Sequence, residues 1–307
     1  MMTSTKIDKA ERKAIRKEGK PIGLSLILYI LITTVAAVAI LLPGLLITGE
    51  LGQLPEIAQF VAPILGLGFM FLYFRSKMEY KTLFKKEKKM TALHFIRILF
   101  MFIGISTVAQ FFYQAFEESL QQMGYSFVPD ALEALLGSNN VFMLLAVWII
   151  APIGEELIFR GFLLRHLEMH GKVAAIFITS LLFGLFHGNP GQGMNAFAVG
   201  LVLGYVAMEY SVIWSIVLHW INNFVFCSLL PGLLGGIPAM APISTLVALI
   251  CLAIAVYMLV YNRRLVAAWF KENAAQENRI EWLLSSGWMN LFLMLHTAMI
   301  VLCIHSL

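Results

Sequence analysis

The chain has 307 residues, of which 60% are hydrophobic and 13% are charged, and its mean hydropathy is +0.81. A soluble globular domain is about half apolar and a quarter charged. This composition therefore excludes an ordinary soluble protein and indicates an integral membrane protein, in which the placement of the small net charge of +4 matters more than its size.

The first 20 residues form a basic tail that contains Lys6, Lys9, Arg12, Lys13, Arg16, Lys17 and Lys20. An apolar run follows, from about Ile22 to Ile47. Because this run is too long for the core of a cleaved signal peptide, we predict that it is retained as the first membrane span.

Further along the chain, runs of mainly apolar residues are long enough to cross a bilayer as helices, which takes about 20 residues each. The predicted spans are Leu24–Ile47, Ile57–Phe74, Leu93–Phe112, Val141–Leu164, Val173–Phe186, Ala196–Met208, Ile213–Leu230, Ile243–Tyr261 and Trp288–Ile304. The fifth and sixth are short. The ninth could instead lie on the membrane surface, because His296 and His305 lower its apolarity. We therefore expect an all-α, polytopic membrane protein with eight or nine transmembrane helices around an intramembrane polar cavity.

Positive residues concentrate in alternate connections, which predicts a multi-pass orientation with the N-terminus in the cytoplasm. The segment Arg75–Lys89 is rich in lysine, whereas Gln114–Asn140 has four acidic residues and no Lys or Arg. Gly188–Asn195 and Pro231–Pro242 carry no charge. The chain then divides into a tail (1–20), a membrane domain (21–261), a cytoplasmic linker (262–287) and an extra C-terminal helix (288–307). We expect a bacterial inner membrane as the location.

Several polar or reactive residues are predicted to have no catalytic part. The three cysteines, Cys227, Cys251 and Cys303, are expected to be buried apolar residues. The Glu117-Glu118 pair and the histidines His166 and His170 are expected to be solvated. His94 and Arg97 should extend to the membrane surface, and His296 and His305 should be surface or packing residues.

Ionisable residues inside predicted spans are the strongest functional signal, because burying them in a bilayer is costly. They are Glu155, Glu156 and Arg160 in the fourth span, His187 at the end of the fifth, and His219 with Asn223 in the seventh. Glu156 and Arg160 are four residues apart and can pair on one helix face, as can His219 and Asn223. Glu155 is turned about 100° from Glu156. Pro152 and Gly154 are expected to kink the helix and open room near Glu155.

These residue types are the ones that amide hydrolysis requires. A buried carboxylate near an imidazole can take a proton from water, and His or Asn side chains can donate hydrogen bonds to a developing oxyanion. If Glu156 pairs with Arg160, then Glu155 is the candidate base. Alternatively, Glu155, His187 and His219 could hold a zinc ion with an open coordination position, so the cofactor is either zinc or none.

Three motifs in this order resemble the signature motifs of the CAAX-protease and bacteriocin-processing family, also called Rce1-like or type II CAAX endopeptidases. They are Glu155-Glu156-x-x-x-Arg160, Phe183-x-x-x-His187 and His219-x-x-x-Asn223. The motif-bearing core covers about residues 141–230. The resemblance implies an intramembrane endopeptidase in which Glu155 and His187 activate water and His219 with Asn223 forms the oxyanion site. It also implies that Glu156, Arg160 and Phe183 support the site.

The implied partners are the lipid bilayer and a membrane-associated protein or peptide substrate, and no nucleic acid. Family members are often labelled metalloproteases, although a metal-free glutamate mechanism is also argued for the family. Two rival functions remain: a catalytically silent bacteriocin-immunity or scaffold protein of the same fold, and a proton-coupled transporter. An inverted repeat would favour the transporter, and the sequence has none that we can detect.

Overall fold

The computed structural model describes residues 9–52, 54–127, 140–234, 237, 240–274 and 279–306. Within them the chain is an all-α bundle, and its single sheet joins two short strands, β1 (Tyr125–Ser126) and β2 (His305–Ser306). Seven helices are long and apolar enough to cross a membrane, and two shorter apolar helices accompany them. The predicted polytopic all-α fold is therefore confirmed. The acidic residues Asp130 and Glu133 of the predicted outer loop lie outside the described residues.

The uninterrupted helices of 15 residues or more are α1 (Lys9–Thr48), α2 (Leu54–Phe74), α3 (Ala92–Gln122), α8 (Lys172–Phe186), α9 (Pro190–Glu209), α12 (Met240–Tyr261) and α15 (Gly287–Leu302). Of these, α8 and α15 are the two shorter apolar helices, and the interrupted helical stretches Val141–His170 and Val212–Leu233 complete the seven that are long enough to cross a membrane. The helices of fewer than 15 residues are α5 (Val141–Leu145), α6 (Ala151–Glu156), α7 (Leu164–Leu167), α10 (Val212–Trp220), α11 (Leu230–Leu234), α13 (Arg263–Asn273) and α14 (Arg279–Leu284). The predicted linker 262–287 thus holds two helices, and the short fifth span is the 15-residue α8.

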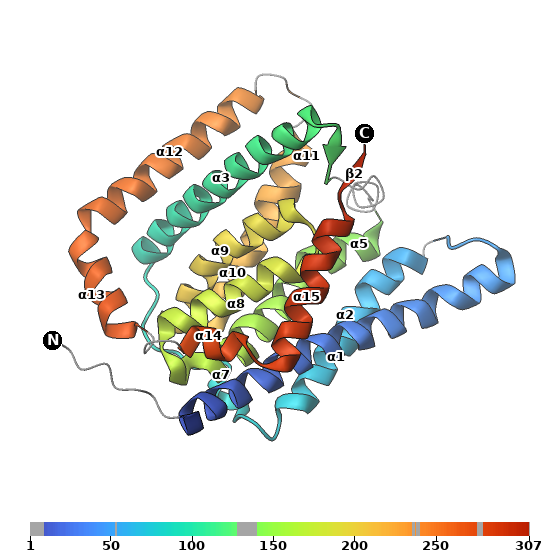
Figure 1. Cartoon of the computed structure of the whole chain (residues 1–307). Helices are drawn as coiled ribbons and strands as arrows, with labels where there is room; N and C mark the ends of the chain where they lie inside the picture. The colour runs from blue at the N-terminus through green and yellow to red at the C-terminus, as the bar shows by residue number, and fades with distance from the viewer. Residues whose placement is uncertain are drawn as a thin grey trace.

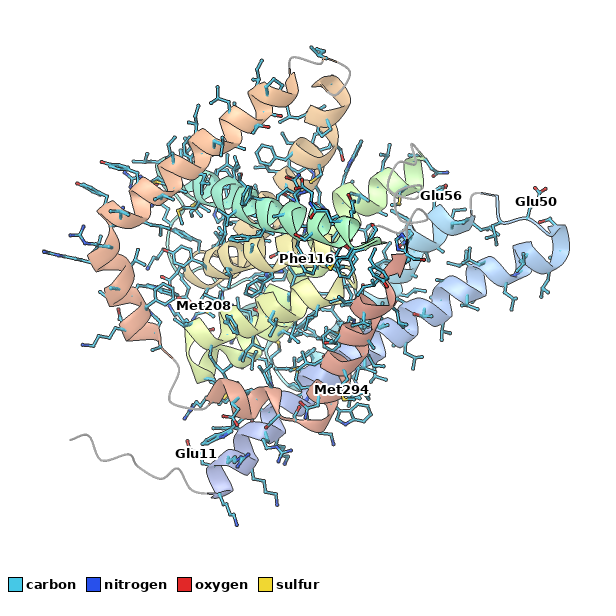
Figure 2. The ribbon with its side chains drawn as sticks, turned by 45° about the horizontal axis from the view of Figure 1, so that its top comes forward. Glu11, Glu50, Glu56, Phe116, Met208 and Met294 are labelled. Atoms are coloured by element: carbon cyan, nitrogen blue, oxygen red, sulfur yellow. The ribbon has the colours of Figure 1, made fainter. Side chains whose placement is uncertain are left out.

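Helices α1 and α2 form a hairpin on one flank of the molecule, while α12 packs against α3 on the opposite flank (Figure 1). At 1.5 Å per residue, the 40 residues of α1 extend for about 60 Å, twice the hydrocarbon thickness of a bilayer. Figure 2 shows Glu11 at one end of α1 and Glu50 just beyond the other. The basic N-terminal part of α1 therefore has to project out of the membrane.

Helix α15 packs along α1 and also contacts α8, with one face buried and the other exposed (Figure 1). Glycines on α1 allow the close approach. A Cβ added at Gly23 would lie 2.4 Å from the Met289 backbone nitrogen, and one at Gly19 would lie 2.2 Å from the Leu283 carbonyl oxygen. His296 is buried and stacks on Phe292, which confirms the expectation of a packing role for it.

We expect Gly23→Ala to lower the free energy of unfolding by about 1–3 kcal/mol, because its methyl group would force two backbones apart. Gly68→Ala is the matched control, since a Cβ at this glycine of α2 meets nothing within 4 Å. Thermal denaturation of both variants in detergent measures the effect. Equal melting temperatures for Gly23→Ala and Gly68→Ala would contradict the close packing of α1 on α15.

One end of the bundle is held by ion pairs around Glu209, at the end of α9. Its carboxylate accepts from Lys172 at 2.7 Å and from the Trp269 indole of α13 at 3.2 Å, and it also pairs with Lys88. The hydrogen bond that Lys88 donates to the Glu209 carboxylate raises the pKa of Lys88. These contacts attach the lysine-rich loop and α13 to the helices that carry the buried polar residues.

Four expectations about individual side chains were wrong. Glu117 is buried, with 7% of the residue exposed, because its carboxylate accepts hydrogen bonds from Ser126 and the Phe127 backbone; Glu118 is exposed as expected. His166 keeps 15% of its side chain exposed and His170 is buried, so neither histidine is solvated. Cys227 is exposed on its helix.

Candidate active site

The polypeptide that carries Glu155 and Glu156 is a helix interrupted by two wider, π-helical segments. Residues 146–150 precede α6 and residues 157–163 follow it. Pro152 has no N–H to donate to the preceding turn, and its ring clashes with the carbonyl four residues back. Wide turns of this kind are frequent at functional sites. The predicted disturbance next to Glu155 is therefore present, as a widening on both sides of α6.

Glu156 lies at the centre of a buried polar network. Its Oε1 accepts from Arg160 Nη1 at 3.1 Å and contacts His219 Nδ1 at 2.9 Å, while its Oε2 contacts the Ser215 hydroxyl. Neither Glu156 nor Arg160 has any exposed side-chain surface. Burial of a carboxylate opposes its charged form, and Arg160 and these hydrogen bonds compensate for that cost. The pairing expected from the four-residue spacing is present.

Arg160 connects this network to α8 and α9. Its Nη2 donates to the Gly200 carbonyl at 3.3 Å, and its guanidinium lies 4.3 Å from the centre of the Phe183 ring. A Cβ at Gly200 would lie 3.0 Å from Arg160 Nη2, so this position leaves little room for a side chain. Arg160 thereby fixes the position of Phe183, which the sequence had assigned a supporting role.

His219 lies between the two carboxylates, Glu155 and Glu156. Its Nδ1 faces Glu156, and its Nε2 lies 3.8 Å from Glu155 Oε2. Because Glu156 accepts the Nδ1 hydrogen, the Nε2 atom is the one turned toward Glu155. Glu155 keeps 22% of its side chain exposed, whereas Glu156 has none. The two adjacent glutamates therefore occupy different environments.

Phe183 lies on the last turn of α8, beside His219, and His187 directly follows the end of this helix. The His187 Nδ1 atom is 2.8 Å from the Phe183 carbonyl oxygen, which leaves its Nε2 free. The Phe183 ring is 4.9 Å from the His187 ring and 5.9 Å from the His219 ring, both edge-on. Gly188 then turns the chain with φ +69°, a conformation that favours glycine, and α9 begins two residues later.

Asn223 lies on a π-helical segment, residues 221–229, that directly follows α10. Its side-chain amide donates to the Val147 carbonyl at 3.1 Å, and its side-chain oxygen accepts from Asn222. One of the two side-chain amide hydrogens of Asn223 is therefore already used in a hydrogen bond. Within the described residues, no side-chain hydrogen bond joins Asn223 directly to Glu155, His187 or His219.

Ser215 belongs to the site although the sequence interpretation did not include it. Besides Glu156, its hydroxyl contacts the Leu203 carbonyl oxygen at 3.1 Å. The sequence does contain a pattern that points to Ser215, because Ser215, His219 and Asn223 are spaced by four residues along one helix. A small hydroxyl inside an apolar helix is common, however, so the spacing alone would not have selected it.

The sequence left open whether Glu155, His187 and His219 bind a zinc ion. A tetrahedral zinc site needs three or four ligand atoms about 2 Å from one point. In the part of the chain that the structure describes, no three His, Cys, Asp or Glu side chains are grouped so that they could hold a metal ion. Glu155, His187 and His219 therefore do not fit a zinc ion in this conformation.

Comparison with known proteins identifies the segment that carries this site. Residues 137–225 match the family model of the Rce1-like proteins, described as type II CAAX prenyl endopeptidase Rce1-like. The match includes every residue of the site described above, from Glu155 to Asn223. No curated protein and no solved structure matches the chain.

Proposed function

We propose, from the premise that residues 137–225 carry the Rce1-like domain of the CAAX protease and bacteriocin-processing family, that the chain is an intramembrane endopeptidase. Its substrate would be a membrane-associated protein or peptide. The observation that carries the proposal is the environment of Glu155. This partly exposed carboxylate lies beside a fully buried Glu156–Arg160 pair and 3.8 Å from His219 Nε2.

The two glutamates have different roles in this proposal. Glu156 cannot act as a base, because its oxygens already contact Arg160, His219 and Ser215. Among the described residues Glu155 makes no side-chain hydrogen bond, and its Oε2 lies 3.8 Å from His219 Nε2 at the edge of the network. A free carboxylate close to an imidazole can accept a proton from water, so we assign Glu155 as the general base.

The reaction then follows from the positions of the side chains. Glu155 takes one proton from a water molecule held by His187 Nε2, and the water oxygen attacks the peptide carbonyl carbon. His219, with Nε2 protonated, and Asn223, through its uncommitted amide hydrogen, donate hydrogen bonds to the oxyanion. The tetrahedral intermediate collapses when Glu155 passes its proton to the leaving amine, which breaks the C–N bond and regenerates the carboxylate.

Glu156, Arg160 and Phe183 support the site without touching the substrate. Glu156 fixes the His219 ring through Nδ1, and a catalytic imidazole commonly needs such a partner to hold its orientation. Arg160 neutralises Glu156 and stacks on Phe183, which in turn lies against both histidines. We extend the proposal to the domain division given above and to a cytoplasmic location of the basic N-terminal end.

The test of the proposed function is cleavage by the purified full-length protein in liposomes. A peptide library is incubated in water enriched in ¹⁸O, and the products are identified by mass spectrometry. Hydrolysis is expected to place one ¹⁸O atom in each new carboxyl terminus. Equal product formation by wild type and by a variant without the Glu155 carboxylate would contradict the proposal.

We expect treatment with a metal chelator to leave the cleavage rate unchanged, because the mechanism uses no metal and the donor set does not fit one. The same peptides are assayed before and after incubation with the chelator and again after added zinc. Loss of activity on chelation, followed by recovery with zinc, would show that Glu155, His187 and His219 rearrange to bind the ion.

A further inference from the structure

Helix α13 is a short amphipathic helix that begins two residues after the end of the apolar span formed by α12. Figure 1 shows it turned away from the direction of α12 and running along one end of the bundle toward α14. The last turns of α12 carry Tyr257 and Tyr261, whose stacked rings belong to residues that are 66% and 73% exposed. Exposed tyrosines at the end of a span are typical of the membrane–water interface. Helix α13 therefore begins at the depth of the lipid headgroups.

One face of α13 packs on the bundle and leaves apolar side chains exposed at its edges. Val266 and Trp269 are half-buried, and the Trp269 ring lies 5.5 Å from that of Tyr205 on α9. At about 100° per residue, Leu265 and Phe270 lie on the two sides of this packed face. They are 71% and 52% exposed. As in other interfacial amphipathic helices, such side chains can enter the boundary between the headgroups and the acyl chains.

The remaining surface of α13 is cationic. Arg263, Arg264 and Lys271 are exposed, and Glu272 is the one acidic residue of this helix. Within the part of the chain that the structure describes, none of the three basic residues forms an ion pair with an acidic side chain. Their charges can therefore bind an anion without breaking an existing contact.

A second basic segment reaches the same place through Glu209, the buried carboxylate at the end of α9. The Lys88 side chain and the Trp269 indole both bind this carboxylate, so α13 and the loop that follows α2 lie side by side. The backbone N–H groups of Glu87 and Lys88 also donate to carbonyl oxygens at this end of α9. These contacts bring together basic residues that are far apart in sequence.

The loop adds cations and an apolar side chain to this surface. Lys86 and Lys89 are exposed and have no ion pair among the described residues, while Lys85 pairs with Glu87. Phe84 is 45% exposed. Cations without acidic partners beside exposed apolar side chains fit a phospholipid with a negative headgroup. A soluble phosphate ion would leave the apolar side chains without a partner.

We propose that α13 and loop residues 84–89 form a binding surface for anionic phospholipids such as phosphatidylglycerol. The phosphodiester group binds the basic residues that have no acidic partner, and the exposed apolar side chains contact the acyl chains. Because α13 and the loop are joined at Glu209, a lipid that contacts both stabilises this end of the bundle. The inference does not depend on the proposed peptidase activity.

The first arm of the test measures lipid affinity by native mass spectrometry of the full-length protein in detergent. Phosphatidylglycerol and phosphatidylcholine with the same acyl chains are titrated separately. We expect the first phosphatidylglycerol molecule to bind about tenfold more tightly, since each basic residue near an anionic headgroup adds favourable electrostatic energy. Equal dissociation constants for the two lipids overturn the proposal.

The variant Arg263→Gln/Arg264→Gln/Lys271→Gln assigns the binding to α13. It removes three exposed charges that make no ion pair among the described residues, so its fold should persist. Its dissociation constants for the two lipids are expected to agree within about twofold, because the electrostatic attraction of α13 is lost. An undiminished preference for phosphatidylglycerol in this variant overturns the proposal.

The matched control is Lys9→Gln/Arg12→Gln/Lys13→Gln, which removes the same number of exposed charges from α1. Among the described side chains of residues 9–30, no large apolar one is exposed, so this segment lacks the second feature of the surface. The control should keep the wild-type preference for phosphatidylglycerol. An equal loss of preference in the control and in the α13 variant overturns the assignment to α13.

The second arm measures melting temperatures in phosphatidylcholine liposomes with and without phosphatidylglycerol. A lipid that binds only the folded protein raises the melting temperature by mass action. For wild type we expect a rise of about 2–5 °C at low salt, which high salt should abolish because it screens exposed charges. The α13 variant should show no rise. The proposal is overturned if wild type shows no rise or if the variant shows the same rise as wild type.

Discussion

Glu155→Gln is expected to reduce the cleavage rate by about 10²–10⁴-fold, because the amide cannot take a proton from water. The substitution keeps the shape of the side chain. Glu155 makes no hydrogen bond within the described residues, so the free energy of unfolding should change by less than about 0.5 kcal/mol. The measurement combines initial rates on one cleaved peptide with thermal denaturation in the same detergent.

Glu118→Gln is the matched control for this substitution. Glu118 is an exposed glutamate on α3, beside the buried Glu117, and the same chemical change there should leave the rate at the wild-type value. A rate for Glu155→Gln within about twofold of wild type would remove Glu155 from the mechanism. A loss of rate accompanied by an equal loss of folded protein would assign the residue a structural role.

Arg160→Met is expected to lower the free energy of unfolding by about 3–5 kcal/mol, the usual cost of leaving one partner of a buried ion pair alone. Arg160 is fully buried, pairs with Glu156, donates to the Gly200 carbonyl and stacks on Phe183. Methionine can fill much of the same volume but can supply none of the charge. Unfolding by denaturant titration in mixed micelles measures the change, and Arg263→Met, at an exposed position on α13, is the control.

The double variant Glu156→Leu/Arg160→Met separates the stability of the ion pair from its role in the site. Replacement of a buried pair by apolar residues of similar volume is often neutral for stability, so the double variant should be more stable than Arg160→Met alone. It should nevertheless be inactive, because His219 Nδ1 would lose its partner. If the double variant loses as much stability as Glu156→Leu and Arg160→Met lose together, the two side chains do not interact.

The local chemistry of the site was predictable from sequence because it depends on helix geometry. A separation of four residues places two side chains on one helix face. This rule predicted the Glu156–Arg160 pair, whose atoms lie 3.1 Å apart in the structure. The same relation links Phe183 with His187, whose Nδ1 contacts the Phe183 carbonyl oxygen. Adjacent residues point in different directions, and Glu155 and Glu156 differ in exposure as that rule requires.

Burial of single side chains depended on packing that no local pattern contains. Glu117 and Glu118 are adjacent, yet only Glu117 is covered, since it accepts the Ser126 hydroxyl hydrogen from the strand that pairs with the C-terminus. His170 was expected in solvent because its neighbours are polar, but only 4% of the residue is exposed.

The sequence by itself determined that the protein is a helical membrane protein with a carboxylate and histidine site in its apolar spans. Apolar length and helical spacing are properties of short stretches of chain, and they hold whatever the rest of the protein does. Only the tertiary structure decided that His219 lies between Glu155 and Glu156, that Ser215 contacts Glu156, and that Tyr29 of the first helix packs against Phe186. Those relations join helices whose distance apart in the chain carries no geometric information, so they follow from side-chain packing between helices and from the glycines that permit it.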